Sequence, residues 1–154
     1  MIENSKKSEV QDEAFAISIR HHRSGIAGSV GVGKTRIGLR HMRYLLNNKM
    51  MTRFLVVGSK KSIYKSWLDE IKEIGYDELI PLIEYSTYRS LSKKNPRDYD
   101  CVYLDECHNL LESHLPFLSA YTGMILGLTG TPPRYEKSAK GLLVKTYCPI
   151  QYSY

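Results

Sequence analysis

Hydrophobic and polar residues follow one another along this chain in blocks that switch between two periods. Residues 54–58 read FLVVG, an unbroken apolar run typical of a strand that is buried on both faces. Residues 34–47 repeat with a helical period instead, so that apolar residues fall on one face and polar residues on the other. The apolar face comprises Gly38, Met42, Leu45 and Leu46, and the polar face comprises Arg36, Arg40, Arg43 and Asn47. The two blocks predict a buried strand and an amphipathic helix.

The alternation of strand and helix continues along the chain. We expect helices at 9–22 and 62–74, the second containing Trp67, and short strands at 25–27, 79–84, 101–104 and 124–128. Strands separated by helices predict an α/β fold with a mainly parallel central sheet and helices on both faces. At 154 residues the chain has the length of one compact domain, so we expect a single domain spanning residues 1–154.

Composition narrows the class of protein without identifying it. The hydrophobic fraction of 42% and the charged fraction of 25% are those of a folded globular protein. No apolar run approaches the length of a membrane span, and the N-terminus MIENSKKSEVQDEAF lacks the apolar core of a secretory signal. We therefore expect an intracellular, cytoplasmic protein with no membrane partner.

The cysteines and the net charge add weaker constraints. Cys101, Cys107 and Cys148 are odd in number and widely spaced, which fits neither a disulfide framework nor paired zinc ligands. We expect buried thiols and no structural metal. The formal net charge of +6 would help the chain to hold a polyanion, but basicity of this size does not by itself indicate one.

A glycine-rich loop supplies the first chemical signal. Residues 28–35 read GSVGVGKT and satisfy the pattern G-x-x-x-x-G-K-[ST] between a predicted strand and a predicted helix. The loop consists of Gly28, Ser29, Val30, Gly31, Val32, Gly33, Lys34 and Thr35, and Arg36 follows it. Its backbone N–H groups and the helix N-terminus would surround phosphates, Lys34 would reach the outer phosphates, and the Thr35 hydroxyl would bind Mg²⁺. Kinases, GTPases, AAA-type ATPases and helicases all remain open at this point.

A pair of carboxylates narrows the possible classes of nucleotide-binding protein. In YDCVYLDECHNL an apolar strand delivers Asp105 and Glu106 at its carboxyl end, where the ligand-binding residues of parallel sheets collect. Asp105 would hold Mg²⁺ through water, and Glu106 would orient and deprotonate the attacking water. Loop and carboxylates together predict ATP hydrolysis with Mg²⁺.

GSVGVGKT, DECH and the LTGTP of residues 128–132 together resemble motifs I, II and III of the DExH-box superfamily 2 helicases and translocases. Weaker similarities extend to Gln11, to VVGSKKSIYKSW at 56–67, which resembles motif Ia, and to EYSTYRSL at 84–91, which resembles motif Ib. The resemblance implies a three-layer RecA-like P-loop domain. It also implies that residues 1–23 form an N-terminal helical segment in which Gln11 contacts adenine.

The resemblance assigns roles residue by residue. It implies that Lys34, Asp105, Glu106 and His108 are catalytic, with His108 sensing the nucleotide. Thr129 and Thr131 would couple the site to nucleic acid, whose backbone would be contacted without sequence preference by Ser59, Lys60, Thr87 and Tyr88. The remaining histidines lack such a context and are interpreted as surface or packing residues: His21, His22, His41 and His114.

The resemblance stops before motifs IV to VI. The last arginine is Arg134, whereas family members use arginines from a second RecA-like domain to stabilise the transferring phosphate. Because an arginine finger changes the rate by roughly a thousandfold or more, we expect slow hydrolysis by this chain until a second RecA-like domain is supplied in cis or in trans.

Three hypotheses follow. The first is the N-terminal motor domain of a superfamily 2 helicase or translocase of a bacterium or a virus-infected host. For it we favour DNA over RNA, because LTGTP resembles the DNA-translocating branches. The alternative is a stand-alone nucleotide-gated module that binds a partner protein or nucleic acid without translocating. A small-molecule kinase is disfavoured, because no lid segment is visible and a kinase does not need DECH.

Overall fold

The computed structural model describes residues 4–28, 33–132 and 138–154. These residues form a six-stranded sheet in the order β3-β2-β4-β5-β1-β6, and every pair of neighbouring strands is parallel. The strands are β1 (Arg23–Ala27), β2 (Phe54–Gly58), β3 (Ile83–Thr87), β4 (Cys101–Asp105), β5 (Met124–Thr129) and β6 (Ile150–Ser153). The predicted α/β fold with a parallel sheet is confirmed.

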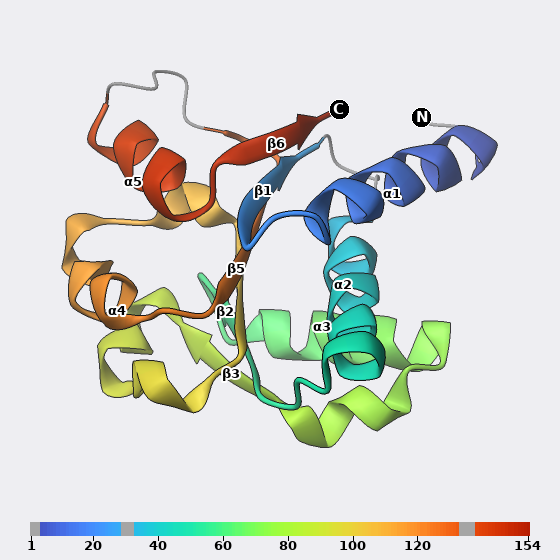
Figure 1. The fold of residues 1–154 in the computed structure, drawn as a ribbon, viewed down its shortest axis with the longest axis horizontal. Coiled ribbons are helices and arrows are strands. Elements are labelled where there is room, and N and C mark those ends of the chain that lie inside the picture. The colour runs from blue at the N-terminus through green and yellow to red at the C-terminus, as the bar shows by residue number, and fades with distance from the viewer. Residues whose placement is uncertain (1–3, 29–32, 133–137) are drawn as a thin grey trace.

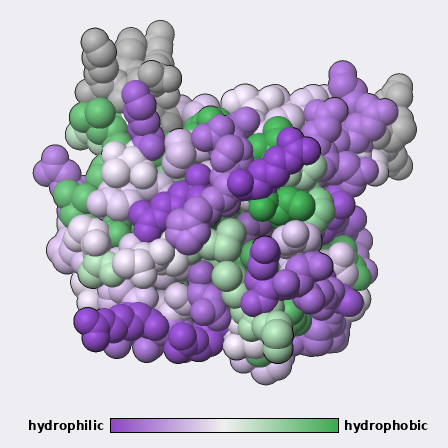
Figure 2. All heavy atoms as spheres, in the orientation of Figure 1, coloured by the Kyte–Doolittle hydropathy of each residue, from purple (hydrophilic) through white to green (hydrophobic). Residues whose placement is uncertain are grey.

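Helices cover both faces of the sheet, as Figure 1 shows. One face carries α1 (Asn4–Ser18), α2 (Lys34–Lys49) and α3 (Ser62–Ile74), and the other carries α4 (Leu115–Ala120) and α5 (Ala139–Tyr147). Short 3₁₀ helices connect these elements: η1 (Asp77–Leu82), η2 (Tyr88–Lys93), η3 (Pro96–Asp98), η4 (Cys107–Asn109) and η5 (Glu112–His114). Figure 2 shows that hydrophilic residues dominate the face in view, with hydrophobic ones in small scattered groups.

Strand β2 explains the unbroken apolar run FLVVG. Phe54 and Val56 pack into the core layer beneath α2 and α3, whereas Leu55 and Val57 pack into the layer on the opposite face. All four side chains are fully buried. The sheet therefore has a hydrophobic core on each face, and both sides of a central strand must be apolar.

One predicted strand is wrong. Residues 79–82 of the expected strand 79–84 belong to η1, and β3 occupies Ile83–Thr87 instead. Pro81 lies inside η1, and its missing N–H group disfavours a place in a hydrogen-bonded ladder. The apolar residues of this segment are still buried where a turn of helix packs on the core, as Leu79 shows.

The helix bounds also differ from expectation at two places. The predicted helix 62–74 is confirmed residue for residue as α3, and α2 extends the predicted 34–47 to Lys49. The first helix was expected at 9–22 but occupies Asn4–Ser18, because the chain must turn before β1 starts at Arg23. Helix α5 and strand β6 were not predicted.

Burial tests one of the smaller expectations. The three cysteines are free and buried, as predicted. Among the described residues, no group of three or more His, Cys, Asp or Glu side chains could hold a metal ion. In the same part of the chain no helix is both long enough and apolar enough to cross a membrane.

Candidate active site

The described part of the glycine loop joins the end of β1 to the start of α2. Gly28 follows β1, and its N–H group donates to the Thr129 carbonyl at the end of β5 over 2.9 Å. Gly33 precedes α2 with φ 74°, a left-handed conformation that favours glycine. The Lys34 ammonium donates to the Gly28 carbonyl over 3.1 Å, so the two ends of the loop are tied together. The predicted residues Ser29, Val30, Gly31 and Val32 lie outside the described residues.

Gln11 reaches this loop from α1. A methyl group added at Gly33 would lie 2.5 Å from Gln11 Nε2, so the amide rests directly against the start of α2. Gln11 is 8% exposed, so its amide is shielded from bulk solvent. Arg36, by contrast, pairs with Glu70 of α3 over 2.6 Å and ties α2 to α3. The structure therefore brings Gln11 to the predicted nucleotide loop, while Arg36 contacts a neighbouring helix.

Asp105 ends β4 and is fixed by two hydrogen bonds. Trp67 Nε1, from α3, donates to Asp105 Oδ2 over 2.9 Å, and the Tyr88 hydroxyl donates to the Asp105 carbonyl over 2.7 Å. Burial raises the pKa of the Asp105 carboxyl, and the Trp67 hydrogen bond opposes that rise. The indole fits because α2 has glycine at Gly38, where a methyl group would lie 2.9 Å from Trp67 Cη2. Neither partner of Asp105 was assigned this role from the sequence.

Glu106 faces the other way because its backbone is unusual. Its φ is 52° and its ψ is 55°, a left-handed conformation that costs a non-glycine residue free energy and is concentrated at functional sites. The carboxylate is exposed and accepts hydrogen bonds from Ser59 Oγ (3.1 Å) and Asn109 Nδ2 (3.4 Å). Adjacent carboxylates thus have separate surroundings, as expected for two different roles.

The lysine and the carboxylates lie near one another. Burial lowers the pKa of Lys34, and the charges of Asp105 and Glu106 act in the opposite direction. A hollow of about 410 Å³ adjoins the two carboxylates. It is lined by Thr35, Ser59, Lys60, Ser62, Ile63, Ser66, Asp105 and Glu106. The Thr35 hydroxyl and the Asp105 carboxylate are hard oxygen donors that suit Mg²⁺, so the residues present fit that ion.

The LTGTP segment closes the site from the β5 side. Thr129 Oγ1 lies 2.7 Å from His108 Nδ1, and Thr131 Oγ1 lies 3.1 Å from the same nitrogen. The Thr131 N–H group donates to Thr129 Oγ1 over 3.0 Å. Between them, a methyl group at Gly130 would lie 3.3 Å from the Gly28 carbonyl. The structure thus joins the predicted sensor His108 to both predicted coupling threonines.

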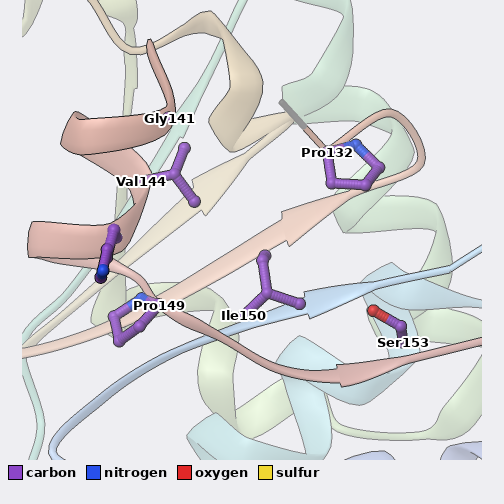
Figure 3. A pocket seen from close by; sticks show the side chains of 7 residues that line it. Pro132, Gly141, Val144, Pro149, Ile150 and Ser153 are labelled. Atoms are coloured by element: carbon purple, nitrogen blue, oxygen red, sulfur yellow. The ribbon is translucent and has the colours of Figure 1, made fainter. Parts of the chain in front are cut away.

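A second hollow lies away from these groups. It has a volume of about 500 Å³ and lies between α5, β6 and the segment after β5 (Figure 3). Its lining residues are Pro132, Gly141, Val144, Lys145, Pro149, Ile150 and Ser153. This lining contains no carboxylate or histidine, so the groups suited to phosphate chemistry lie in the hollow beside Asp105 instead.

Comparison with known proteins decides the family. Residues 4–134 match the family described as "Type III restriction enzyme, res subunit". The chain belongs to this family. No curated protein sequence is similar to it at a significant level.

Solved helicase structures share the fold of this res-subunit family member. The UvsW helicase of bacteriophage T4 superposes with a TM-score of 0.79 at 15% identity, over 93% of this chain and 58% of its own. The Hef helicase domain of Pyrococcus furiosus superposes with a TM-score of 0.71 at 16% identity, over 93% of this chain and 37% of its own. The third structure is the SWI2/SNF2 ATPase core of Sulfolobus solfataricus, which was solved with double-stranded DNA. It superposes with a TM-score of 0.66 at 17% identity, over 86% of this chain and 33% of its own. The chain therefore spans between a third and three fifths of the length of these three proteins.

The sheet and its helices are those of a RecA-like helicase domain, as predicted. Family and fold together support an ATPase-type domain of the superfamily 2 helicases.

The residues expected to meet nucleic acid have different surroundings in this family member. Ser59 and Lys60 are exposed at the end of β2. Thr87 ends β3, but its Oγ1 accepts a hydrogen bond from the Ser90 N–H group and caps η2. Tyr88 follows β3 and is 7% exposed, and its hydroxyl donates to the Asp105 carbonyl.

The other histidines are mostly packing residues. His41 is buried, and its Nδ1 lies 2.8 Å from the Tyr103 hydroxyl; His114 is also buried, whereas His22 is exposed. Trp67 and Asn109 are neighbours of the site that the sequence left unassigned. Trp67 had a signal, since it lies in the segment that resembles motif Ia.

Proposed function

We propose that this chain is the N-terminal motor domain of a DExH-box superfamily 2 helicase or translocase, and that it binds and hydrolyses ATP with Mg²⁺. One observation carries the proposal. The Asp105–Glu106 pair at the end of β4 adjoins the same hollow as Thr35, next to the ammonium of Lys34. A phosphate-binding loop beside two carboxylates in distinct environments is the combination of groups that nucleotide hydrolases use.

Each group has a task in this proposal. Lys34 places positive charge on the outer phosphates, and Gly33 leaves room for the loop backbone to approach them. Thr35 and Asp105 would hold Mg²⁺, which supplies neutralisation of phosphate charge when bound. Glu106 accepts a proton from the attacking water. Its separate hydrogen-bonding partners keep it available for that task while Asp105 stays with the metal.

The proposed track is nucleic acid, with DNA favoured over RNA. The similarity of LTGTP to DNA-translocating branches supports DNA, as does the likeness of the fold to an ATPase core solved with double-stranded DNA. Ser59, Lys60 and the backbone around Thr87 lie at the carboxyl ends of β2 and β3, beside the carboxylates, where they would contact phosphates. Such contacts carry no base information, so we propose sequence-independent binding.

Full activity requires a second RecA-like domain in this proposal. The solved relatives are longer than this chain, and helicases of this kind complete the ATP site with arginines from that domain. The alternative, a nucleotide-gated module without translocation, is less well supported because a binding module has no need of the water-activating carboxylate of Glu106.

The test is ATP turnover by the full chain with single-stranded and double-stranded DNA and RNA, alone and mixed with a separately purified second RecA-like domain. We expect slow turnover by the chain alone, faster turnover with the second domain and a further increase with DNA. Lys34→Ala should abolish all of it. ATP binding without turnover in every mixture would overturn the motor proposal and favour the nucleotide-gated module.

A further inference from the structure

Arginines on the polar face of α2 each bind a different neighbouring element. The ion pairs are Arg36 with Glu70 of α3, Arg40 with Asp12 of α1, and Arg43 with Glu78 of η1. The helical period of this segment indicated a polar face, and in the structure that face joins α2 to the elements around it. Arg40 is the arginine that binds α1.

Helix α1 lies beside α2, next to the start of that helix (Figure 1). Among the described side chains of α1, Val10 and Ala14 are the buried hydrophobic ones. Two small side chains bury little apolar area, so they fix the position of the helix only weakly. The polar contacts of α1 with its neighbours therefore matter for where its side chains lie.

Arg40 makes two contacts with α1 at once. Its Nη1 lies 2.8 Å from the Asp12 carboxylate, and its Cζ lies 4.5 Å from the centre of the Phe15 ring. A guanidinium can combine an ion pair with stacking on an aromatic face because it is planar. Asp12 is next to Gln11 in the chain, and Phe15 follows Gln11 by one helical turn. Arg40 thus holds the part of α1 that carries Gln11.

This part of α1 meets the end of the nucleotide loop. A methyl group added at Gly33 would lie 2.5 Å from Gln11 Nε2 and 3.6 Å from Lys7 Cε. Lys34 and Thr35 follow Gly33 directly, and they are the residues proposed to hold the phosphates and Mg²⁺. The Gln11 amide is therefore placed beside a nucleotide that occupies this loop.

A fixed glutamine amide can distinguish the purine bases. It offers one acceptor and two N–H donors. The edge of adenine presents the N6 donor beside the N7 acceptor, whereas the same edge of guanine presents two acceptors, O6 and N7. An amide can pair with both groups of adenine only if its position is held, because hydrogen bonds weaken steeply with poor geometry.

We propose that Arg40 is a positioning residue that sets the preference of the site for ATP over GTP. It acts through α1, by holding Asp12 and Phe15 so that Gln11 stays against the end of the nucleotide loop. Loss of Arg40 leaves Lys34 and Thr35 in place, so binding of the base weakens while bound ATP is hydrolysed at the same rate. The inference rests on the proposed function and deepens it, because it identifies what selects the base.

The test measures the Kd for ATP and for GTP with Mg²⁺ by isothermal titration calorimetry on the full chain, and the single-turnover rate at saturating ATP. The variants are Arg40→Gln, Arg40→Lys and Asp12→Asn, the last of which removes the same ion pair from the α1 side. Arg43→Gln is the matched control. Arg43 also pairs with a carboxylate and lies 4.6 Å from the centre of a ring, that of Tyr76, but it contacts the segment around η1. Thermal unfolding is measured on every protein.

We expect Arg40→Gln to raise the Kd for ATP by about three- to tenfold, the combined effect of one ion pair and one cation–ring contact. The Kd for GTP and the single-turnover rate at saturating ATP should stay unchanged. Arg40→Lys keeps the ion pair and should restore part of the affinity for ATP, and Asp12→Asn should weaken ATP binding by a smaller factor. Arg43→Gln should lose stability as Arg40→Gln does but bind both nucleotides like the wild type.

A double variant tests whether the effect passes through Gln11. Gln11→Ala removes the amide, so adding Arg40→Gln to it should raise the Kd for ATP no further. Two residues that act through one contact give such non-additive effects, whereas independent residues give additive ones.

Several results would overturn the inference alone. Equal loss of ATP and GTP affinity in Arg40→Gln, or a further loss in the Gln11→Ala background, would show that Arg40 does not act through Gln11. An Arg43→Gln protein with the same loss of ATP affinity would assign the effect to α2 as a whole. A wild-type chain that binds ATP and GTP equally has no base preference for Arg40 to set. A wild-type chain that binds neither nucleotide would overturn the proposed function itself, and the inference with it.

Discussion

Replacing Trp67 with phenylalanine removes one hydrogen bond from the carboxylate that we expect to hold Mg²⁺. Trp67 Nε1 donates to Asp105 Oδ2 over 2.9 Å, and the indole is fully buried. Phenylalanine keeps an aromatic ring in the same core layer but has no donor. A hydrogen bond to a charged group contributes about 1.5–3 kcal/mol, which corresponds to roughly a ten- to 150-fold change in an equilibrium constant. We expect the concentration of Mg²⁺ needed for half-maximal turnover to rise by about tenfold or more.

The same variant changes the pH dependence in a defined direction. Burial raises the pKa of Asp105 and the Trp67 hydrogen bond opposes that rise, so removing the bond raises the pKa further. Asp105 binds Mg²⁺ in its ionised form. The acid limb of the pH profile of ATP turnover should therefore move to higher pH in Trp67→Phe, and the deficit should be greatest in acid.

A matched control separates this effect from lost stability. Tyr103→Phe also removes a buried polar group from the core layer that contains Trp67, because the Tyr103 hydroxyl lies 2.8 Å from His41 Nδ1. Among the hydrogen bonds of the described residues, none joins Tyr103 to Asp105. Turnover is measured against Mg²⁺ concentration and pH for both variants, with thermal unfolding alongside. Equal Mg²⁺ and pH dependence in the two variants would refute the positioning role of Trp67.

Three further changes probe the core and the coupling segment. Burial lowers the pKa of His41 to about 4, so the unfolded state binds more protons between that value and about 6.5, and stability should fall by about 3 kcal/mol as pH falls through this window. Urea unfolding at a series of pH values measures this loss. The loss should be absent in His41→Gln and unchanged in the control His22→Gln, which replaces an exposed histidine. Gly127→Ala places a methyl group 2.8 Å from Cys148 Sγ, and such overpacking should cost about 1–3 kcal/mol in thermal unfolding. Thr129→Val removes the hydroxyl that bridges the DECH and LTGTP segments, and it should reduce stimulation of turnover by DNA several-fold while ATP affinity in a binding titration stays unchanged.

The central elements were predictable from the sequence because their patterns have one physical solution. FLVVG is apolar at every position since both of its faces are covered, and the period of residues 62–74 fits a helix alone. LIPLIE is different, because a short apolar run fits a strand and a packed helical turn equally well. Pro81 was the local signal against the strand, and the segment forms η1 up to Leu82.

Some parts of the candidate site were likewise predictable from the sequence, and others were not. Residues contributed by one continuous segment, such as Lys34 and Thr35 or Asp105 and Glu106, were predictable because spacing along the chain sets their chemistry. The contact of Trp67 with Asp105 depends instead on β2 lying next to β4 in the sheet, which places α3 beside the end of β4. Contacts of this kind join separate segments, and no single stretch of sequence encodes them.

The most direct test of the central claim is single-turnover conversion of bound ATP by the wild-type chain and by Glu106→Gln, with Mg²⁺ present. Glutamine keeps the size of the side chain but cannot accept the proton of the attacking water. The account predicts that both proteins bind ATP with similar affinity, and that the variant forms ADP at least about a hundredfold more slowly. Equal rates of ADP formation in the two proteins would contradict the assignment of Glu106 and of this hollow as the site of ATP hydrolysis.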